Sequence, residues 1–275
     1  MKTISSRSNP TFKFLKALKE IKGRKEHQAF LVEGVSFVRE LLAQEKNKVL
    51  WVVFERGGLK KLKPLLKQAE EAKISILVLE DPLFKELVVS DTPQGVLAVV
   101  KFPIFEDLSE RLGKTPCCVV VLEEIQDPSN VGAIIRTAAA VGVACVFYTK
   151  GTADPFSPKA VRASAGAVLH VPVIKFERLT ELAEDLKKRG FGLTATVVKG
   201  GEELFSFSFP PKTALVFGNE AKGLSKEGME VSDYRLTIPI VGKVESLNVA
   251  VSAGILLYQW LKDRFNIVKT QIKGL

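Results

Sequence analysis

The sequence has little of the material on which several common kinds of protein depend. It holds three cysteines, Cys117, Cys118 and Cys145, all inside apolar runs, so neither a disulfide framework nor a C-x-x-C metal or redox pair is present. Only two histidines occur, His27 and His170, which leaves little for a His-based zinc site or a catalytic triad. We therefore expect no metal site and a reducing compartment.

Membrane-spanning stretches and several well-known motifs are also missing. No stretch approaches the roughly 18 uncharged residues that span a bilayer, and the N-terminus lacks the apolar core of a signal peptide. There is no G-x-G-x-x-G after a strand, no G-x-x-x-x-G-K-[ST] phosphate loop and no G-x-S-x-G elbow, which disfavours dinucleotide redox chemistry, NTP hydrolysis and serine esterase chemistry. We expect a soluble, cytoplasmic protein without a membrane partner.

The features that the sequence does have include a length sufficient for two domains and an excess of positive charge. A chain of 275 residues with 46% hydrophobic content can form one or two cores. The net charge of +9 is concentrated early, because residues 1–105 carry 19 basic and 12 acidic side chains, a net +7. Residues 1–28 hold eight Lys or Arg against two Glu, a density that attracts a polyanion such as nucleic acid. A solubilising lysine-rich surface has the same composition, so charge alone leaves both interpretations open.

Hydrophobic patterning divides the chain into two α/β parts. The first, residues 1–102, begins with a basic helix predicted from Pro10 to about Ile21 and ending at Gly23, followed by alternating short strands and helices. Residues 103–116 have the prolines, glycine and charges of a linker with one or two helical turns.

The second part, residues 117–275, contains uninterrupted apolar runs separated by helical patterns. Continuous rather than alternating hydrophobicity indicates strands covered on both faces, and therefore a parallel sheet. The helix that starts after Asn248 is apolar around its whole circumference, so we expect it to be buried within the fold or against a second subunit. The runs are 117–122, 143–148, 171–174, 191–198, 213–217 and 235–240.

Three polar segments follow apolar runs, at the sheet edge where open α/β folds bind ligands. In the first, Asn130 or Ser129 can cap a helix whose opening turns carry a single charge, Arg136. The residues one turn away from Arg136 on the same helix face are small, so a ligand could approach its guanidinium. A structural ion pair of Arg136 with Glu123 or Glu124 and a phosphate- or ribose-binding role both remain open.

The other two segments are rich in glycine and in capping residues. Residues 215–225 place two glycines around Asn219, Glu220 and Lys222, which suits either a loop whose backbone contacts a ligand or an ordinary strand-to-helix turn. Residues 238–248 end with Ser246 and Asn248 at the start of the last helix, and capping explains one of them more easily than two. Three such loops converging at one edge would form a pocket for a small polar ligand beside Arg136.

Together, these segments resemble the three ordered motifs of the SpoU (TrmH-like) RNA ribose 2′-O-methyltransferases, which belong to the SPOUT superfamily. The stretches that match are N-V-G-A-I-I-R-T-A at 130–138, F-G-N-E-A-K-G-L-S at 217–225 and I-P-I-V-G-K-V-E-S-L-N-V-A at 238–250. Residues 1–100, with R-S-N-P at 7–10 and F-L-V-E-G at 30–34, are similar to the substrate-binding domain of many members. The sequence departs from the family at Ala221, where many members carry glycine.

The resemblance implies both a fold and a reaction. The fold is an α/β SPOUT methyltransferase domain at 117–275, with a parallel sheet and a trefoil knot, preceded at 1–102 by a small α/β, ribosomal-protein-like RNA-binding domain. The reaction is transfer of the methyl group of S-adenosylmethionine (AdoMet) to a ribose 2′-hydroxyl of structured RNA, with 23S ribosomal RNA favoured over tRNA. The family implies a homodimer with composite active sites. A tRNA enzyme, a methyltransferase acting on a base nitrogen and a catalytically silent RNA-binding protein are the alternatives.

The resemblance also assigns site residues. The residues that it assigns to the reacting ribose are Asn130, Arg136, Glu220, Ser246 and Asn248. The residues that it assigns to the cofactor are Thr196, Gly218, Asn219, Ile238, Pro239 and Leu247. The basic first part supplies Arg7, Lys13, Arg24 and Lys25 as candidate RNA contacts. Because a guanidinium stays protonated throughout the physiological pH range, we expect Arg136 to stabilise the developing alkoxide rather than to act as a base.

Overall fold

The structure is a computed structural model that describes the backbone of residues 1–273 and the side chains of residues 1–264. Its contacts divide the chain into two compact units. Met1–Ile104 and Asp154–Leu169 form the first unit, and Phe105–Ala153 and His170–Leu275 form the second. The patterning of the sequence gives no sign that Asp154–Leu169 packs with the first unit. The part expected at 117–275 extends two residues beyond the described backbone.

The first unit is built on a mixed five-stranded sheet in the order β1-β4-β3-β5-β2. Strand β3 runs parallel to β4 and antiparallel to β5, and β2 pairs antiparallel with β5. Buried leucine, valine and phenylalanine side chains from the sheet and the helices form its core. The strands are β1 (Lys2–Ile4), β2 (Ala29–Glu33), β3 (Val49–Glu55), β4 (Ser75–Leu79) and β5 (Val96–Lys101).

The basic N-terminal helix predicted to end at Gly23 is wrong in its extent, because two helices occupy this region. α1 ends at Ala17, and Gly23 lies inside α2 instead of stopping a helix. A Cβ on Gly23 would lie 2.1 Å from the carbonyl oxygen of Ala17, so glycine lets α2 pack directly on the end of α1. The helices of this unit are α1 (Pro10–Ala17), α2 (Ile21–His27), α3 (Val35–Gln44), α4 (Lys63–Glu71), α5 (Asp81–Leu87) and α8 (Pro158–Ala163).

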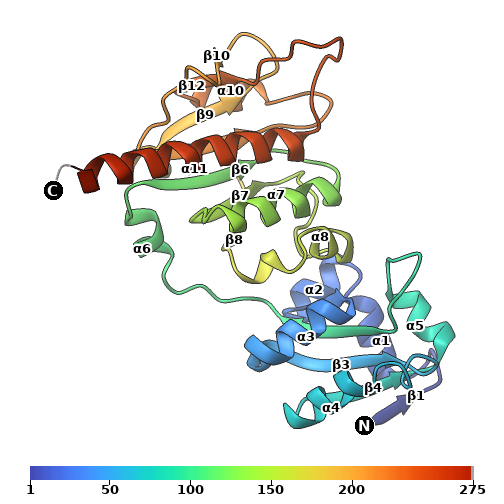
Figure 1. Cartoon of the computed structure of the whole chain (residues 1–275). Coiled ribbons are helices and arrows are strands. Elements are labelled where there is room, and N and C mark those ends of the chain that lie inside the picture. Colours follow the sequence, from blue (N-terminus) through green and yellow to red (C-terminus); the bar gives the residue numbers. More distant parts are fainter. Residues whose placement is uncertain (274–275) are drawn as a thin grey trace. The chain divides into compact units, whose positions relative to one another are not determined.

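The second unit is built on a seven-stranded sheet in the order β10-β12-β9-β11-β6-β7-β8. Every neighbouring pair in this sheet is parallel, which confirms the sheet expected from the uninterrupted apolar runs. The strands are β6 (Cys117–Leu122), β7 (Cys145–Thr149), β8 (Val173–Phe176), β9 (Gly192–Thr196), β10 (Glu202–Glu203), β11 (Lys212–Phe217) and β12 (Tyr234–Thr237), and Figure 1 shows them in chain order by colour.

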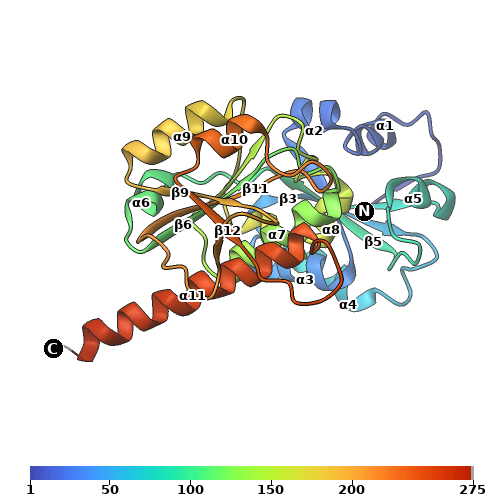
Figure 2. The same ribbon diagram turned by 90° about the horizontal axis from the view of Figure 1, so that it is seen from above.

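Helices cover both faces of this sheet, with α9 and α10 on one face and α7 and α11 on the other (Figure 2). Leu182 and Leu186 of α9 belong to the same core cluster as Val119 and Val121 of β6. On the other face, α11 packs along α7. The helices of this unit are α6 (Leu108–Gly113), α7 (Pro128–Ala140), α9 (Leu179–Lys188), α10 (Lys226–Val231) and α11 (Val249–Lys273).

Helix α11 has two different apolar faces. Ala253, Leu256, Leu257 and Trp260 are buried within the unit, while Val251, Ile255 and Tyr258 are exposed in the single chain. The helix was expected to be buried on all sides, but within the single chain only one of its faces is buried. Among the described residues, no helix is both long enough and apolar enough to cross a bilayer.

Candidate functional site

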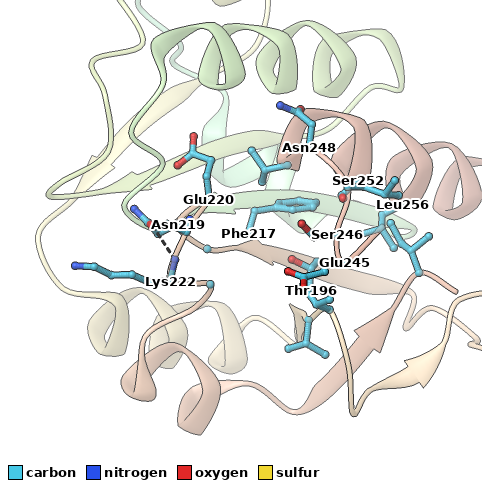
Figure 3. A pocket seen from close by; sticks show the side chains of 18 of the residues that line it. Thr196, Phe217, Asn219, Glu220, Lys222, Glu245, Ser246, Asn248, Ser252 and Leu256 are labelled. Atoms are coloured by element: carbon cyan, nitrogen blue, oxygen red, sulfur yellow. Dashed lines mark hydrogen bonds between the residues drawn. The ribbon is translucent and has the colours of Figure 1, made fainter. Parts of the chain in front are cut away.

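A pocket lies in the second unit beyond the carboxyl ends of three neighbouring strands. Its volume is about 560 Å³, and its walls come from the segments that follow β9, β11 and β12 and from the first turns of α11. Because these strands are parallel, their carboxyl ends share one edge of the sheet. Figure 3 shows the loop after β11 on one side of the pocket and the approach to α11 on the other. The lining includes Thr196, Val198, Phe217, Gly218, Asn219, Glu220, Lys222, Ile238, Ile240, Ser246, Leu247, Asn248, Ser252 and Leu256.

The loop after β11 folds back on itself so tightly that a side chain is excluded at its start. A Cβ on Gly218 would lie 2.3 Å from the backbone nitrogen of Leu224. Gly223, with φ of +71°, donates its N–H to the carbonyl oxygen of Asn219 at 2.8 Å and closes the turn. Ala221 is not among the residues with positive φ, so the loop accepts a side chain at the position where the sequence departs from the family.

The side chain of Asn219 fixes the inside of this loop. Its Oδ1 accepts hydrogen bonds from the backbone N–H groups of Ala221 and Lys222, both at 3.0 Å. Its Nδ2 donates to the carbonyl oxygen of Glu124, 2.9 Å away, in the segment after β6. Asn219 therefore ties the loops after β6 and β11 together, and the lining of the pocket is held in place before any ligand binds.

Glu220, Asn130 and Asn248 form a continuous chain of hydrogen bonds. Asn248 Nδ2 donates to Asn130 Oδ1 at 3.0 Å, and Asn130 Nδ2 donates to Glu220 Oε1 at 2.9 Å. The same carboxylate accepts the backbone N–H groups of Gln126 at 3.0 Å and Asp127 at 3.2 Å. Residues from all three of the polar segments are thereby brought together, as the convergence argument predicts.

The chain of donors decides the charge of Glu220. Partial burial by itself raises the pKa of this carboxyl group, but the hydrogen bonds from Gln126, Asn130 and Asp127 outweigh burial and lower the pKa below its ordinary value. Glu220 is consequently ionised at neutral pH. Because every one of these groups donates to it, the carboxylate is a weak base and a strong anchor for its neighbours.

Asn248 also caps α11. Its Oδ1 accepts the backbone N–H of Ala250 at 2.8 Å and of Val251 at 3.3 Å, so this residue is a helix cap as well as a part of the hydrogen-bonded chain. Ser246 and Ser252 add hydroxyl groups to the pocket wall on the same side (Figure 3). The cap expected from the sequence is therefore confirmed for Asn248, and the same side chain also lies in the pocket wall.

Arg136 is exposed on α7 and does not line this pocket. Within the part of the chain that the structure describes, it makes no hydrogen bond or ion pair. The ion pair with Glu123 is excluded in this structure, because the Glu123 carboxylate accepts the N–H of Ser225 at 2.9 Å and its Oγ–H at 2.6 Å. The guanidinium of Arg136 is thus available to a ligand or to another chain.

The structure places the remaining expected residues in different ways. Five of the six candidate cofactor residues line the pocket, and Pro239 does not. Of the five assigned to the ribose, three line it, Asn130 contacts two of them, and Arg136 lies outside. The pocket is also lined by residues that were not predicted from the sequence, among them Val198, Ile240, Ser252 and Leu256. Of these, Ile240 is part of the third motif.

Arg24 requires a correction among the candidate RNA contacts. Its side chain is only 2% exposed, and it is occupied by Asp154 and by the carbonyl oxygens of Leu18 and Lys19. A guanidinium so placed cannot reach a phosphate, because all of its surroundings are protein. In contrast, Arg7, Lys13 and Lys25 are exposed, and no cluster of potential metal ligands occurs among the described residues.

Comparison with known proteins decides the family. Residues 118–258 match the SpoU rRNA Methylase family, and residues 9–98 match the MRM3-like substrate binding domain. The chain belongs to the SpoU rRNA methylase family. Another member, the 23S rRNA (guanosine(2553)-2′-O)-methyltransferase RlmP of Bacillus subtilis, is 34% identical over 94% of this chain and 98% of its own length.

Solved structures of the SpoU family have the same fold. The SpoU methyltransferase AviRb of Streptomyces viridochromogenes in complex with AdoMet aligns with a TM-score of 0.82 and 28% identity, covering 94% of this chain and 98% of that one. An RNA 2′-O ribose methyltransferase aligns with a TM-score of 0.79 and 30% identity, covering 96% and 99% of the two chains. These alignments span both units, so the SpoU fold expected from the motifs is confirmed.

Proposed function

We propose that this protein is an AdoMet-dependent methyltransferase that acts on a ribose 2′-hydroxyl of structured RNA, with 23S ribosomal RNA as the favoured substrate. The observation that carries the proposal is the convergence of the three motif segments on one pocket, joined by the hydrogen bonds among Asn130, Glu220 and Asn248. Family members with these printed activities, RlmP and the RNA 2′-O ribose methyltransferase, support the same reaction.

The pocket fits AdoMet in size and chemistry. Its volume of about 560 Å³ is within the usual range for cofactor sites of roughly 300–1,000 Å³. Glycine at position 218 lets the loop fold back against the backbone of Gly223 and Leu224, and the folded loop lines the pocket, where its backbone groups can bind the polar ends of the cofactor. We assign Thr196, Gly218, Asn219, Ile238 and Leu247 to this role, with Pro239 as a neighbour that lies outside the pocket wall. When bound, AdoMet supplies an electrophilic sulfonium methyl group.

The chain's own residues then orient the attacking hydroxyl. We assign Asn130, Ser246 and Asn248 to holding the ribose, with Glu220 as a positioning residue that fixes Asn130. Because the lowered pKa of Glu220 makes it a poor proton acceptor, the proton of the 2′-hydroxyl leaves to a phosphate or to water. Arg136 stabilises the negative charge that develops on the oxygen.

The position of Arg136 supports a homodimer with composite sites. Arg136 does not line the pocket of its own chain, so a second copy that presents its α7 would complete the site. The exposed apolar face of α11, Val251, Ile255 and Tyr258, is the surface that such a dimer would bury. We further propose that the segments around this pocket form the trefoil knot of the SPOUT superfamily.

We assign a separate role to each part of the chain, as the family resemblance implies. We propose that residues 1–102 bind RNA, that 103–116 link the two parts and that residues 117–275 carry the methyltransferase site, with Arg7, Lys13 and Lys25 among the RNA contacts. Ribosomal RNA as a substrate places the reaction in the cytoplasm. A tRNA substrate is the second candidate, supported by a family relative of Staphylococcus aureus whose name includes both tRNA and rRNA methyltransferase activity.

The test is incubation of the protein with methyl-labelled AdoMet and either unmodified 23S rRNA or total tRNA. We expect label in 23S rRNA, and partial alkaline hydrolysis should show one linkage that resists cleavage, because a 2′-O-methyl group blocks it. Label in tRNA instead of 23S rRNA would identify tRNA as the substrate. Label in a base, or no AdoMet binding in calorimetry, would refute the proposed reaction and favour a silent RNA-binding protein.

A further inference from the structure

A second pocket lies entirely within the first unit, far along the chain from the cofactor residues. Its volume is about 320 Å³. Three segments form it: the start of α3 at 33–40, the loop before β5 at 90–94 and the end of α8 at 162–165. It is lined by Glu33, Gly34, Ser36, Phe37, Glu40, Ser90, Thr92, Gln94, Arg162 and Ala165.

Hydrogen bonds and close packing hold the walls of this pocket. Gln94 Oε1 accepts the backbone N–H of Val35 at 2.7 Å, and Glu33 Oε2 accepts that of Val89 at 3.0 Å, so the loop before β5 is tied to the start of α3 at two points. A Cβ on Gly166 would lie 2.4 Å from the ring of Phe37, so glycine lets the α8 segment lie against this ring. The pocket is therefore formed without a ligand.

Several polar groups of these walls have no partner among the described residues. They are the hydroxyl groups of Ser36, Ser90 and Thr92, the Nε2 of Gln94 and the guanidinium of Arg162. The lining carries one arginine and two glutamates, a formal charge of −1, so a phosphate group is disfavoured here. A neutral ligand with both donors and acceptors on its edge suits this combination of hydroxyl, amide, guanidinium and carboxylate groups.

We infer that this pocket receives one unstacked nucleobase of the RNA substrate. The inference rests on the proposed function and deepens it by naming a base-recognition site in the substrate-binding part. Proteins read single-stranded RNA by taking splayed bases into pockets with an aromatic wall and polar groups on the base edge, and Phe37 with the hydroxyl groups of Ser36 and Thr92 supplies both. The family match over residues 9–98 covers most of the lining.

A different surface of the same unit suits the RNA backbone. Lys13, Lys16 and Lys19 of the α1 region line a separate hollow, with only Ala17 and Glu20 besides. Phosphate contacts fix the position of a nucleic acid and carry no sequence information, whereas contacts to base edges specify it. The lysines and the pocket should therefore differ in how their contributions depend on salt.

The experiment compares two double variants that lose the same chemical groups. Ser36→Ala with Thr92→Val removes two pocket hydroxyls, and Thr3→Val with Ser75→Ala removes two exposed hydroxyls elsewhere in the same unit. Binding of an unmodified 23S rRNA transcript, or of tRNA if tRNA is the substrate found, is measured by filter binding over a series of KCl concentrations. AdoMet affinity and thermal unfolding are measured in parallel.

We expect the pocket variant to bind RNA about tenfold more weakly, with an unchanged dependence of log K on log salt, because two neutral hydrogen bonds are lost. The control should match the wild type, and Lys13→Gln should reduce the salt slope by about one. Ultraviolet crosslinking of the wild-type complex should attach a base to the peptide that contains Phe37 or to the one that contains Thr92.

Two results from the pocket variant would overturn the inference while leaving the proposed function intact. One is an RNA affinity equal to that of the wild type, and the other is a loss of affinity accompanied by a smaller salt slope, which indicates a phosphate contact. Crosslinks confined to other peptides would contradict it as well. If the wild type neither binds nor methylates rRNA or tRNA, the proposed function fails first and takes the pocket assignment with it.

Discussion

Arg24 and Asp154, 130 positions apart in the chain, form an ion pair with a distance of 2.5 Å between Nη2 and Oδ2. The other N–H groups of Arg24 that have partners donate to Asp154 Oδ2 and to the carbonyl oxygens of Leu18 and Lys19. One side chain thus holds the end of α1, the start of α2 and the segment after β7 in a single arrangement. The positive charge is structural although it lies in the most basic stretch of the sequence.

We predict that Asp154→Ala lowers the free energy of unfolding by about 3 kcal/mol, because it leaves a buried guanidinium without its counter-ion. Urea denaturation followed by fluorescence and circular dichroism measures the change. Lys67→Ala, which removes one partner of the exposed pair Lys67–Glu71, is the control and should cost less than about 0.5 kcal/mol. Equal small effects of both variants would show that the Arg24 pair contributes nothing specific.

Gly218→Ala should abolish AdoMet binding while the protein stays folded. The added Cβ would meet the backbone nitrogen of Leu224 at 2.3 Å, so the loop that lines the pocket must open. Calorimetric titration with AdoMet should show at least a hundredfold weaker binding. In Gly113→Ala the new methyl group meets nothing within 4 Å, and cofactor affinity should be unchanged. Retained affinity in Gly218→Ala would place the cofactor elsewhere.

Arg136→Ala should reduce turnover by about 10²–10³ and leave AdoMet affinity nearly unchanged, because the side chain lies outside the pocket and, in the proposed mechanism, stabilises the developing alkoxide. Arg136→Lys keeps the charge and loses the planar fork, so an intermediate rate is expected. Single-turnover methylation and calorimetry provide the two readouts. A loss of cofactor affinity as large as the loss of rate would contradict this role.

The pKa of Glu220 gives a prediction for the pH dependence of stability. A carboxyl group whose pKa is lowered on folding stabilises the folded state above its unfolded pKa, about 4.3, and this stabilisation is lost as pH falls through the folded value. The difference in unfolding free energy between the wild type and Glu220→Gln should therefore be constant from pH 6 to 8 and shrink below about pH 4. If this difference in unfolding free energy grew as the pH fell, the pKa of Glu220 would be raised rather than lowered on folding, which would refute the prediction.

Val251→Asp should convert the proposed homodimer into a monomer, because it places a charge on the exposed apolar face of α11. An acidic residue in the first turn is favourable for the helix itself, so folding should be retained. Sedimentation velocity measures the mass. Ile21→Asp introduces the same charge at an exposed apolar position in the first unit and should stay dimeric. If the wild type is already monomeric, the proposed composite site is wrong.

Much of the second unit could be predicted from its sequence. The apolar runs marked strands buried on both faces, and the capping residue Asn248 marked the start of α11. The convergence of the three segments followed from the parallel sheet alone, since parallel strands end at one edge. What periodicity could not supply was the order of the strands, because β12 lies between β9 and β10 through pairings between distant parts of the chain.

The errors in the first unit have a common physical cause. Gly23 has the local properties of a helix stop, and Arg24 has those of a phosphate ligand. In the folded protein, however, contacts with other segments determine the role of each residue. Gly23 is required by the close approach of Ala17, and Arg24 is neutralised by Asp154 from the second half of the sequence. Local propensity and charge density contain no information about a partner 130 positions away.

The distribution of the pocket residues has a consequence for biosynthesis. All of the residues that line the AdoMet pocket lie between Thr196 and Leu256, and the first unit is completed by Asp154–Leu169. During translation, the unit that we propose binds RNA is synthesised in full well before the proposed cofactor site is. With the proposed assignments, a nascent chain that still lacks its final helix therefore carries the RNA-binding unit without a complete site for the methyl donor.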